Sequence, residues 1–107
     1  MHSLNDRFPK HNVIWEYSNP RVVQKKAREY LGSDAVIFMS TRKNKKYCIF
    51  DKNLNKWIHF GQLGYEDYTK HLDNSRRKNY LARSTSIRGD WKTNKYSPNN
   101  LSIHLLW

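Results

Sequence analysis

The hydrophobic pattern of this chain changes its period near Gly32, and that change constrains the fold more than any other feature. Before it, Asn19 and Pro20 are a helix start, because Asn accepts an orphan backbone N–H and Pro suits the first helical position. Beyond Gly32 come three short runs rich in β-branched and aromatic residues, 35–40, 47–51 and 56–60. The sequence therefore predicts a helix over 20–31 followed by a three-stranded antiparallel meander.

The helix over 20–31 is amphipathic, with its apolar side chains on one stripe and its charged ones elsewhere. The stripe holds Val23, Ala27, Tyr30 and Leu31, and the mostly basic outer side holds Arg21, Lys25, Arg28 and Glu29. Asp73 to Ser75 can cap a further helix over about 76–83, and Ser97 with Pro98 can start another. The predicted fold class is α+β, a small three-stranded antiparallel meander with one N-terminal amphipathic helix and short C-terminal helices.

Residues 1–18 show neither the helical nor the strand period, and we expect them to form an N-terminal arm. Within it, an extended segment over 13–17 would place Trp15 and Tyr17 on one side as an anchor. The remaining residues, 19–107, are expected to form a single small α+β domain, because a chain of 107 residues has room for one small core.

Cysteine use and apolar run length exclude several protein classes. Cys48 is the single cysteine, so an internal disulfide is impossible and a reducing, intracellular compartment is expected. The longest apolar run, 35–39, is far shorter than the roughly 20 residues that cross a bilayer, so no membrane span is expected.

The charge balance predicts a polyanionic partner. Lysine and arginine number 20 against 9 acids, which gives a formal net charge of +11. The candidate polyanion-binding residues are Arg42, Lys43, Lys45, Lys46, Arg76, Arg77, Lys78, Arg83, Arg88, Lys92 and Lys95. Arg76 and Arg77 stand at a predicted helix start, where the dipole disfavours cations, so an anion or an acidic neighbour is expected there.

Aromatic residues are interleaved with these cations and have two possible roles. They can stack on bases or sugars, or they can anchor neighbouring protein chains. The candidates for stacking or interface contacts are Trp15, Tyr65, Tyr68, Trp91, Tyr96 and Trp107. The simpler alternative is a solvated charged face above aromatic residues that belong to the core.

The sequence favours neither metal binding nor catalysis. No two of the five histidines stand three or four residues apart, so we expect neither a metal site nor a cofactor. A small nuclease can be imagined from His71 or His104 with Asp67, Asp73 and Arg76. These residues are scattered along the chain and form no recognised catalytic motif, so the protein is predicted not to be an enzyme.

The segment over residues 46–107 resembles a family of short, lysine-rich, uncharacterised proteins of nucleocytoplasmic large DNA viruses, the giant viruses. The likeness rests on residues 46–51 (KYCIFD), 56–62 (KWIHFGQ), 64–71 (GYEDYTKH) with Asp73, 76–77 (RR), 80–83 (YLAR), 89–91 (GDW), 96–102 (YSPNNLS) and 105–107 (LLW). In such a family a hydrophobic residue is expected at position 48, where this chain has cysteine. The resemblance implies a viral origin and a place in the virion, and it supplies no catalytic residue.

Two functions are therefore expected from different classes. The first is a non-enzymatic basic virion structural protein, a minor capsid or capsid-associated component, that docks on neighbouring virion proteins and on a polyanionic surface. The alternative is a sequence-independent DNA- or RNA-binding protein used in genome packaging or host interaction. Sequence-specific reading is not expected, because no helix carries the base-reading side chains within a known frame.

Overall fold

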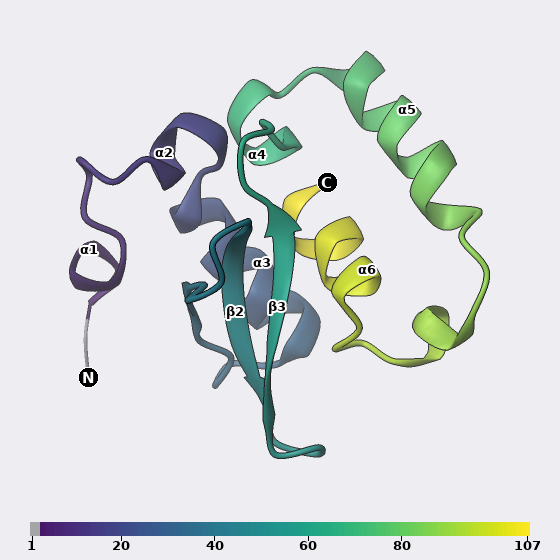
Figure 1. The fold of residues 1–107 in the computed structure, drawn as a ribbon, viewed down its shortest axis with the longest axis horizontal. Helices are drawn as coiled ribbons and strands as arrows, with labels where there is room; N and C mark the ends of the chain where they lie inside the picture. Colours follow the sequence, from purple (N-terminus) through teal and green to yellow (C-terminus); the bar gives the residue numbers. More distant parts are fainter. Residues whose placement is uncertain (1–2) are drawn as a thin grey trace.

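The molecule contains one antiparallel sheet of three strands, in the order β1-β2-β3. The strands of this computed structural model, which describes residues 3–107, are β1 (Ile37–Met39), β2 (Lys45–Asp51) and β3 (Lys56–Gln62). Helices α3 (Pro20–Leu31) and α6 (Pro98–Leu101) lie on one side of the sheet (Figure 1). The predicted α+β fold with its three-stranded antiparallel sheet is confirmed.

Strand register separates the two faces of the sheet. Ile37, Ile49 and Ile58 stand opposite one another across the three strands and pack into the core. Because side chains alternate along a strand, their neighbours Phe38 and Cys48 point to the other face. The second strand begins earlier than predicted and the third ends later, since Lys45 pairs with Gln62 and lengthens the hairpin.

The α3 helix has the boundaries that its flanking residues predict. The Asn19 side chain accepts a hydrogen bond from the backbone N–H of Arg21 (3.1 Å), and Pro20 takes the first helical position. Gly32 ends the helix with a φ of 126°, a value that residues with a Cβ rarely adopt. The helix buries Val23 and Ala27 and contributes them to the core.

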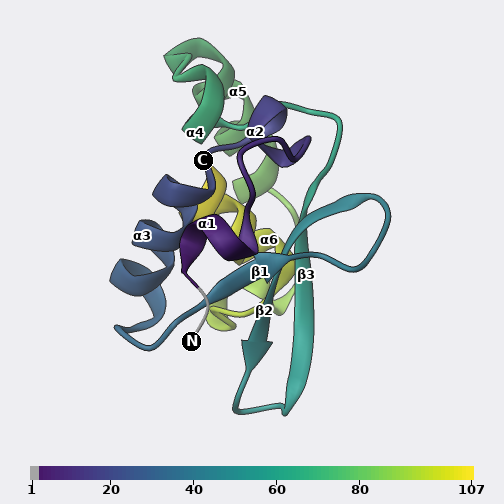
Figure 2. The same cartoon turned by 90° about the vertical axis from the view of Figure 1, so that its left-hand side faces the viewer.

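The core lies between the sheet and a layer of helices (Figure 2). That layer includes α3, α6 and the π-helical turn η2 (Ser102–Leu106), which directly continues α6. The buried apolar side chains of the core come from residues 8–60 and from the C-terminal turns α6 and η2: Phe8, Ile14, Val23, Ala27, Ala35, Ile37, Tyr47, Ile49, Phe60, Leu101, Leu105 and Leu106.

Residues 3–18, expected to form an arm, are folded against this core, and residues 1–2 lie outside the described part. The segment contains two one-turn helices, α1 (Leu4–Arg7) and α2 (Ile14–Tyr17). The expected extended segment over 13–17 is wrong, because this turn buries Ile14. Phe8 is fully buried, with its ring at a steep angle to that of Tyr47 (centroids 5.6 Å apart). Short helical turns hide a period that needs two or more turns to show.

The second long helix stands at the periphery (Figure 1). The chain leaves β3 through α4 (Tyr68–His71), forms α5 (Asn74–Thr85), and returns through η1 (Asp90–Thr93). The Asp73 carboxylate caps α5 by accepting from two backbone N–H groups, as predicted, and the helix is longer than expected. Of its residues only Ser84 is buried, so α5 contributes almost nothing to the core.

Candidate polyanion-binding groove

Lys46, expected on a cationic hairpin tip, is instead buried. Its side chain is 3% exposed, and its Nζ donates to Oδ2 of Asp67 at 3.1 Å. The carboxylate is 1% exposed, so this ion pair is withdrawn from water. Burial lowers the pKa of Lys46, and the nearby Asp67 opposes that shift. Lys46 is therefore not available at the surface to bind an external anion.

The other oxygen of Asp67 joins a buried hydrogen-bond network. It accepts from the backbone N–H (3.0 Å) and the hydroxyl of Thr69. The Thr69 hydroxyl is 3.2 Å from that of Ser18, which accepts from the Tyr47 hydroxyl at 2.7 Å. The network ties the start of α4 to β2 and to the end of α2, and so fixes the root of the segment that carries α5.

Beneath α5 lies a groove of about 1020 Å³, which we name the α5 groove. It is bounded by α5 on one side and by β3, α6 and η2 on the other. Its lining residues are Lys45, Lys46, Gly61, Gln62, Tyr65, Glu66, Arg76, Asn79, Tyr80, Ala82, Arg83, Pro98, Asn99, Ser102, Leu106 and Trp107. The groove exists because α5 touches the rest of the molecule at only a few points.

The α5 groove carries positive charge that the described protein does not neutralise. Arg76 pairs with Glu66 at 3.3 Å, which supplies the acidic neighbour expected at the start of α5. Within residues 3–107, neither Lys45 nor Arg83 pairs with a carboxylate. All 20 lysines and arginines lie in this range, and only three of them form ion pairs. The charge excess is therefore left to face solvent or a partner.

Aromatic side chains line the same groove. Tyr65 is 65% exposed, which is unusual for so large a ring. Tyr80 of α5 stacks on Trp107, with centroids 4.2 Å apart and planes 10° from parallel. Arg77 donates from its Nε to the carbonyl oxygen of Trp107 (2.7 Å), which fastens α5 at this point. Two of the predicted aromatic residues, Tyr65 and Trp107, thus line the same groove as three predicted cations besides the buried Lys46, namely Lys45, Arg76 and Arg83.

The other predicted cations lie elsewhere on the surface. Arg42 and Lys43 are exposed in the loop before β2, while Arg77 and Lys78 are exposed on α5 but do not line its groove. Arg88, Lys92 and Lys95 are exposed in residues 86–97 between α5 and α6, which we name the return segment. Lys95 lies over the Tyr30 ring (4.8 Å) and donates to the Tyr30 carbonyl, so part of its hydrogen-bonding capacity is used internally.

The remaining predicted aromatic residues have structural contacts. Trp15 and Tyr96 pack against the core, and Trp15 donates from Nε1 to the Phe8 carbonyl (3.2 Å). Trp91 donates to the Ile87 carbonyl (2.6 Å) within the return segment. Tyr68 lies beneath the Arg77 guanidinium (5.2 Å) at the junction of α4 and α5. For Trp15 and Tyr96, contact with the core fits the simpler reading.

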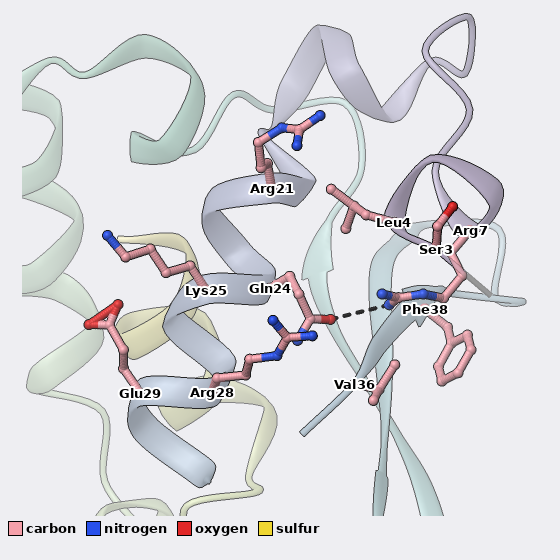
Figure 3. A pocket seen from close by; sticks show the side chains of 10 residues that line it. All are labelled: Ser3, Leu4, Arg7, Arg21, Gln24, Lys25, Arg28, Glu29, Val36 and Phe38. Atoms are coloured by element: carbon pink, nitrogen blue, oxygen red, sulfur yellow. Dashed lines mark hydrogen bonds between the residues drawn. The ribbon is translucent and has the colours of Figure 1, made fainter. Parts of the chain in front are cut away.

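A second groove, which the sequence analysis missed, lies between α1, α3 and β1 (Figure 3). Its volume is about 670 Å³, and we name it the arginine groove after Arg7, Arg21 and Arg28. Arg7 reaches across it to donate to Oε1 of Gln24 (3.2 Å) and to the Ile37 carbonyl. Burial, with the positive charge of Arg28, lowers the pKa of Arg7.

A sequence signal for the arginine groove did exist. Arg21, Lys25 and Arg28 are spaced by four and three residues, which places them along one face of α3. The amphipathic pattern alone predicts a surface helix with a mostly basic outer side. Arg7 belonged to the expected arm, and nothing in its local pattern indicates that it would lie opposite α3.

The residues considered for a nuclease do not come together. Asp67 is held by Lys46, and the His104 ring stacks on Tyr30 (4.2 Å). His71 accepts through Nδ1 from the backbone N–H of Asp73 (2.9 Å), and burial together with Arg76 lowers its pKa. Among residues 3–107, no three histidine, cysteine or acidic side chains are grouped as metal ligands.

No helix in that range is both long enough and apolar enough for a bilayer crossing.

Comparison with known proteins gives one family match. Residues 35–84 match the model of a family of unknown function (DUF5754). This span is a little under half of the chain and contains the sheet, α4 and nearly all of α5. No curated protein and no solved structure matches the chain. The family description states neither source nor activity, so the resemblance to giant-virus proteins stays a prediction. The match adds similarity to this family over the sheet, α4 and most of α5.

Proposed function

We propose that the protein is a non-enzymatic nucleic-acid-binding protein whose α5 groove holds the phosphate backbone without reading sequence. The observation that carries this proposal is the meeting of Lys45 and Arg83, which have no carboxylate partner among the described residues, with the exposed ring of Tyr65. Cations without internal partners attract phosphates and release the counterions that surround them. An exposed aromatic ring beside them can stack on a base or a sugar.

The polar lining of the groove suits a backbone ligand. Gln62, Asn79 and Asn99 supply amide donors between the cations, and such side chains commonly contact phosphate and sugar oxygens. Asn99 already spends one amide hydrogen on the Ser84 carbonyl (3.1 Å), which also holds α5 over the groove. Contacts of this kind position a duplex or a strand but carry no sequence information.

The test compares variants that change equal charge at different places. The double variant Lys45→Gln/Arg83→Gln removes two cations from the α5 groove, and Lys10→Gln/Lys70→Gln removes two exposed cations that line neither groove. Affinity for a labelled 20-base-pair DNA duplex is measured by fluorescence anisotropy over a series of salt concentrations.

The slope of log affinity against log salt is negative, and we expect it to be shallower by about 1.8 in the groove variant, because each lost phosphate contact removes roughly 0.9 from its magnitude. The control variant should change the slope much less. Equal losses in both variants would show that net charge alone attracts the DNA and would overturn the assignment of the groove. An unrelated duplex of equal length should bind equally well, since base edges are not read.

A role in the virion is the second candidate, and a separate observation favours it. Several large apolar side chains are exposed away from the α5 groove, namely Val13 (45%), Leu54 (56%), Leu72 (67%) and Ile87 (50%). Each is a separate apolar contact that a minor capsid or capsid-associated component would use in docking on neighbouring virion proteins. Mass spectrometry of purified particles should find the protein at fixed stoichiometry, and its absence from them would refute this role.

A further inference from the structure

The face of the sheet that points away from the core carries a cluster of three aromatic rings, Phe38, Phe50 and Trp57, which we name the aromatic face. The Trp57 ring has its centroid 5.6 Å from that of Phe38 and 5.4 Å from that of Phe50. Both neighbours meet the indole at steep angles, 80° and 67°. One side chain from each strand therefore contributes to a continuous aromatic surface.

No described helix covers the hairpin end of β2 and β3, where Phe50 and Trp57 pair. Two views a quarter turn apart, Figures 1 and 2, both show α3 and α6 on the opposite side of the sheet. Trp57 remains 48% exposed. Exposed tryptophan is uncommon on a surface that meets only water, and a half-exposed ring supported by two others is a ready surface for a flat partner.

The chemistry at the edge of the aromatic face indicates which kind of flat partner the face would bind. Phe38 belongs both to this face and to the lining of the arginine groove, so the two surfaces are continuous. The Arg7 guanidinium carbon lies 5.5 Å from the centre of the Phe38 ring. Figure 3 shows Arg28 extending toward Arg7, whereas the carboxylate of Glu29 extends to the other side of α3. Aromatic rings thus adjoin arginines that no groove carboxylate faces.

We propose that the aromatic face and the arginine groove together bind a single-stranded nucleic acid, with unpaired bases stacked on Trp57 and Phe38 and the phosphates held by Arg28 and Arg7. Charge complementarity selects this occupant, because an apolar protein surface would leave the adjoining arginines unpaired. Stacking on side chains requires unpaired bases, since the bases of a duplex already stack on one another. This site shares no lining residue with the α5 groove and is a second, independent binding surface.

The experiment measures the affinity of the full chain for a labelled 20-nucleotide oligothymidine and for the 20-base-pair duplex. Trp57→Ala should lower affinity for the single strand by about 5- to 150-fold, the range that one base–aromatic stack contributes, and leave duplex affinity unchanged. Trp57→Phe should retain most of the affinity because it keeps a ring. Ile87→Ala is the matched control, since it truncates another large apolar side chain that is half exposed, and it should change neither affinity.

Arg28→Gln tests the phosphate side of the same site without touching the rings. The negative slope of log affinity against log salt for oligothymidine should become shallower by about 0.7, the value of one contact on a single strand. Unchanged single-strand affinity in Trp57→Ala would overturn the proposal, as would an equal loss for both ligands. A change from dimer to monomer in Trp57→Ala, seen by analytical ultracentrifugation with affinity unchanged, would also overturn it by assigning the face to a second copy.

These outcomes are separate from those that test the α5 groove. If Lys45→Gln/Arg83→Gln behaves like its control while Trp57→Ala loses single-strand affinity, the groove proposal fails and the aromatic-face proposal stands. If the groove variant loses duplex affinity while Trp57→Ala binds oligothymidine normally, the reverse holds.

Discussion

Replacing Asp67 by asparagine should destabilise the fold strongly, because it leaves a buried ammonium group without a counter-charge. Asparagine keeps the volume of the side chain and an oxygen that can still accept from Thr69. What is lost is the negative charge 3.1 Å from Nζ of Lys46, at a site where both side chains are at most 3% exposed. Removing one partner of a buried ion pair costs about 3–5 kcal/mol.

Lys46 itself sets an upper limit on this cost. The unpaired ammonium can lose its proton, and for a lysine with an ordinary pKa of 10.5 that costs about 1.4 kcal/mol per pH unit, or about 5 kcal/mol at pH 7. The unfolded chain then binds one more proton than the folded variant, so the stability of the variant rises with pH. The destabilisation should therefore be smaller at pH 9 than at pH 7.

The assay is urea and thermal unfolding followed by circular dichroism, for the wild type, Asp67→Asn, Lys46→Met and the double variant. Asp67→Asn should lower Tm by roughly 15–30 °C. The double variant should recover much of this loss, because neutral groups of similar size can replace a buried ion pair at little cost. A loss below about 1 kcal/mol in Asp67→Asn, or no coupling energy in the double-mutant cycle, would refute the burial of this pair.

Three further predictions concern other positions. Gly61→Ala should cost more than about 1 kcal/mol in urea unfolding, because φ is 79° and the new Cβ would lie 2.8 Å from Leu106, and a neutral effect would contradict this close packing. Asp73→Ala should cost about 1 kcal/mol and reduce helical circular dichroism, since the cap of α5 is lost, whereas Asp73→Asn should lose little. The lowered pKa of His71 contributes stability that is complete above pH 6.5 and declines as pH falls toward the folded-state pKa. His71→Gln should therefore flatten part of the decline between pH 7 and 5 in urea midpoints, and an unchanged pH profile would contradict that assignment.

Helices and strands whose ends are marked by residues close in sequence were predictable from the sequence. Asn19 with Pro20, and Ser97 with Pro98, place the starts of α3 and α6 correctly because a cap is a contact between neighbours in the chain. The three strands were also predictable, since β-branched and aromatic runs mark them. Their ends moved by up to two residues, because pairing such as that of Lys45 with Gln62 depends on the partner strand.

Features that depend on distant residues were not predictable. Lys46 reads as one more cation in a basic run, and only the fold brings Asp67, 21 residues later, to its Nζ. The arginine groove needs Arg7 opposite α3, a contact set by the burial of Phe8. The α5 groove likewise depends on the few contacts that α5 makes with the rest of the protein, such as the stacking of Tyr80 on Trp107. The basic amphipathic pattern of α5 does not indicate these contacts.

The most direct test of the account is the salt dependence of duplex binding by the unmodified protein. If Lys45 and Arg83, which have no carboxylate partner among the described residues, each meet a phosphate, log affinity should fall with log salt with a slope of about −1.8 or steeper. A slope near zero, or no binding at low salt, would contradict the claim that the cationic surface exists to hold a nucleic acid.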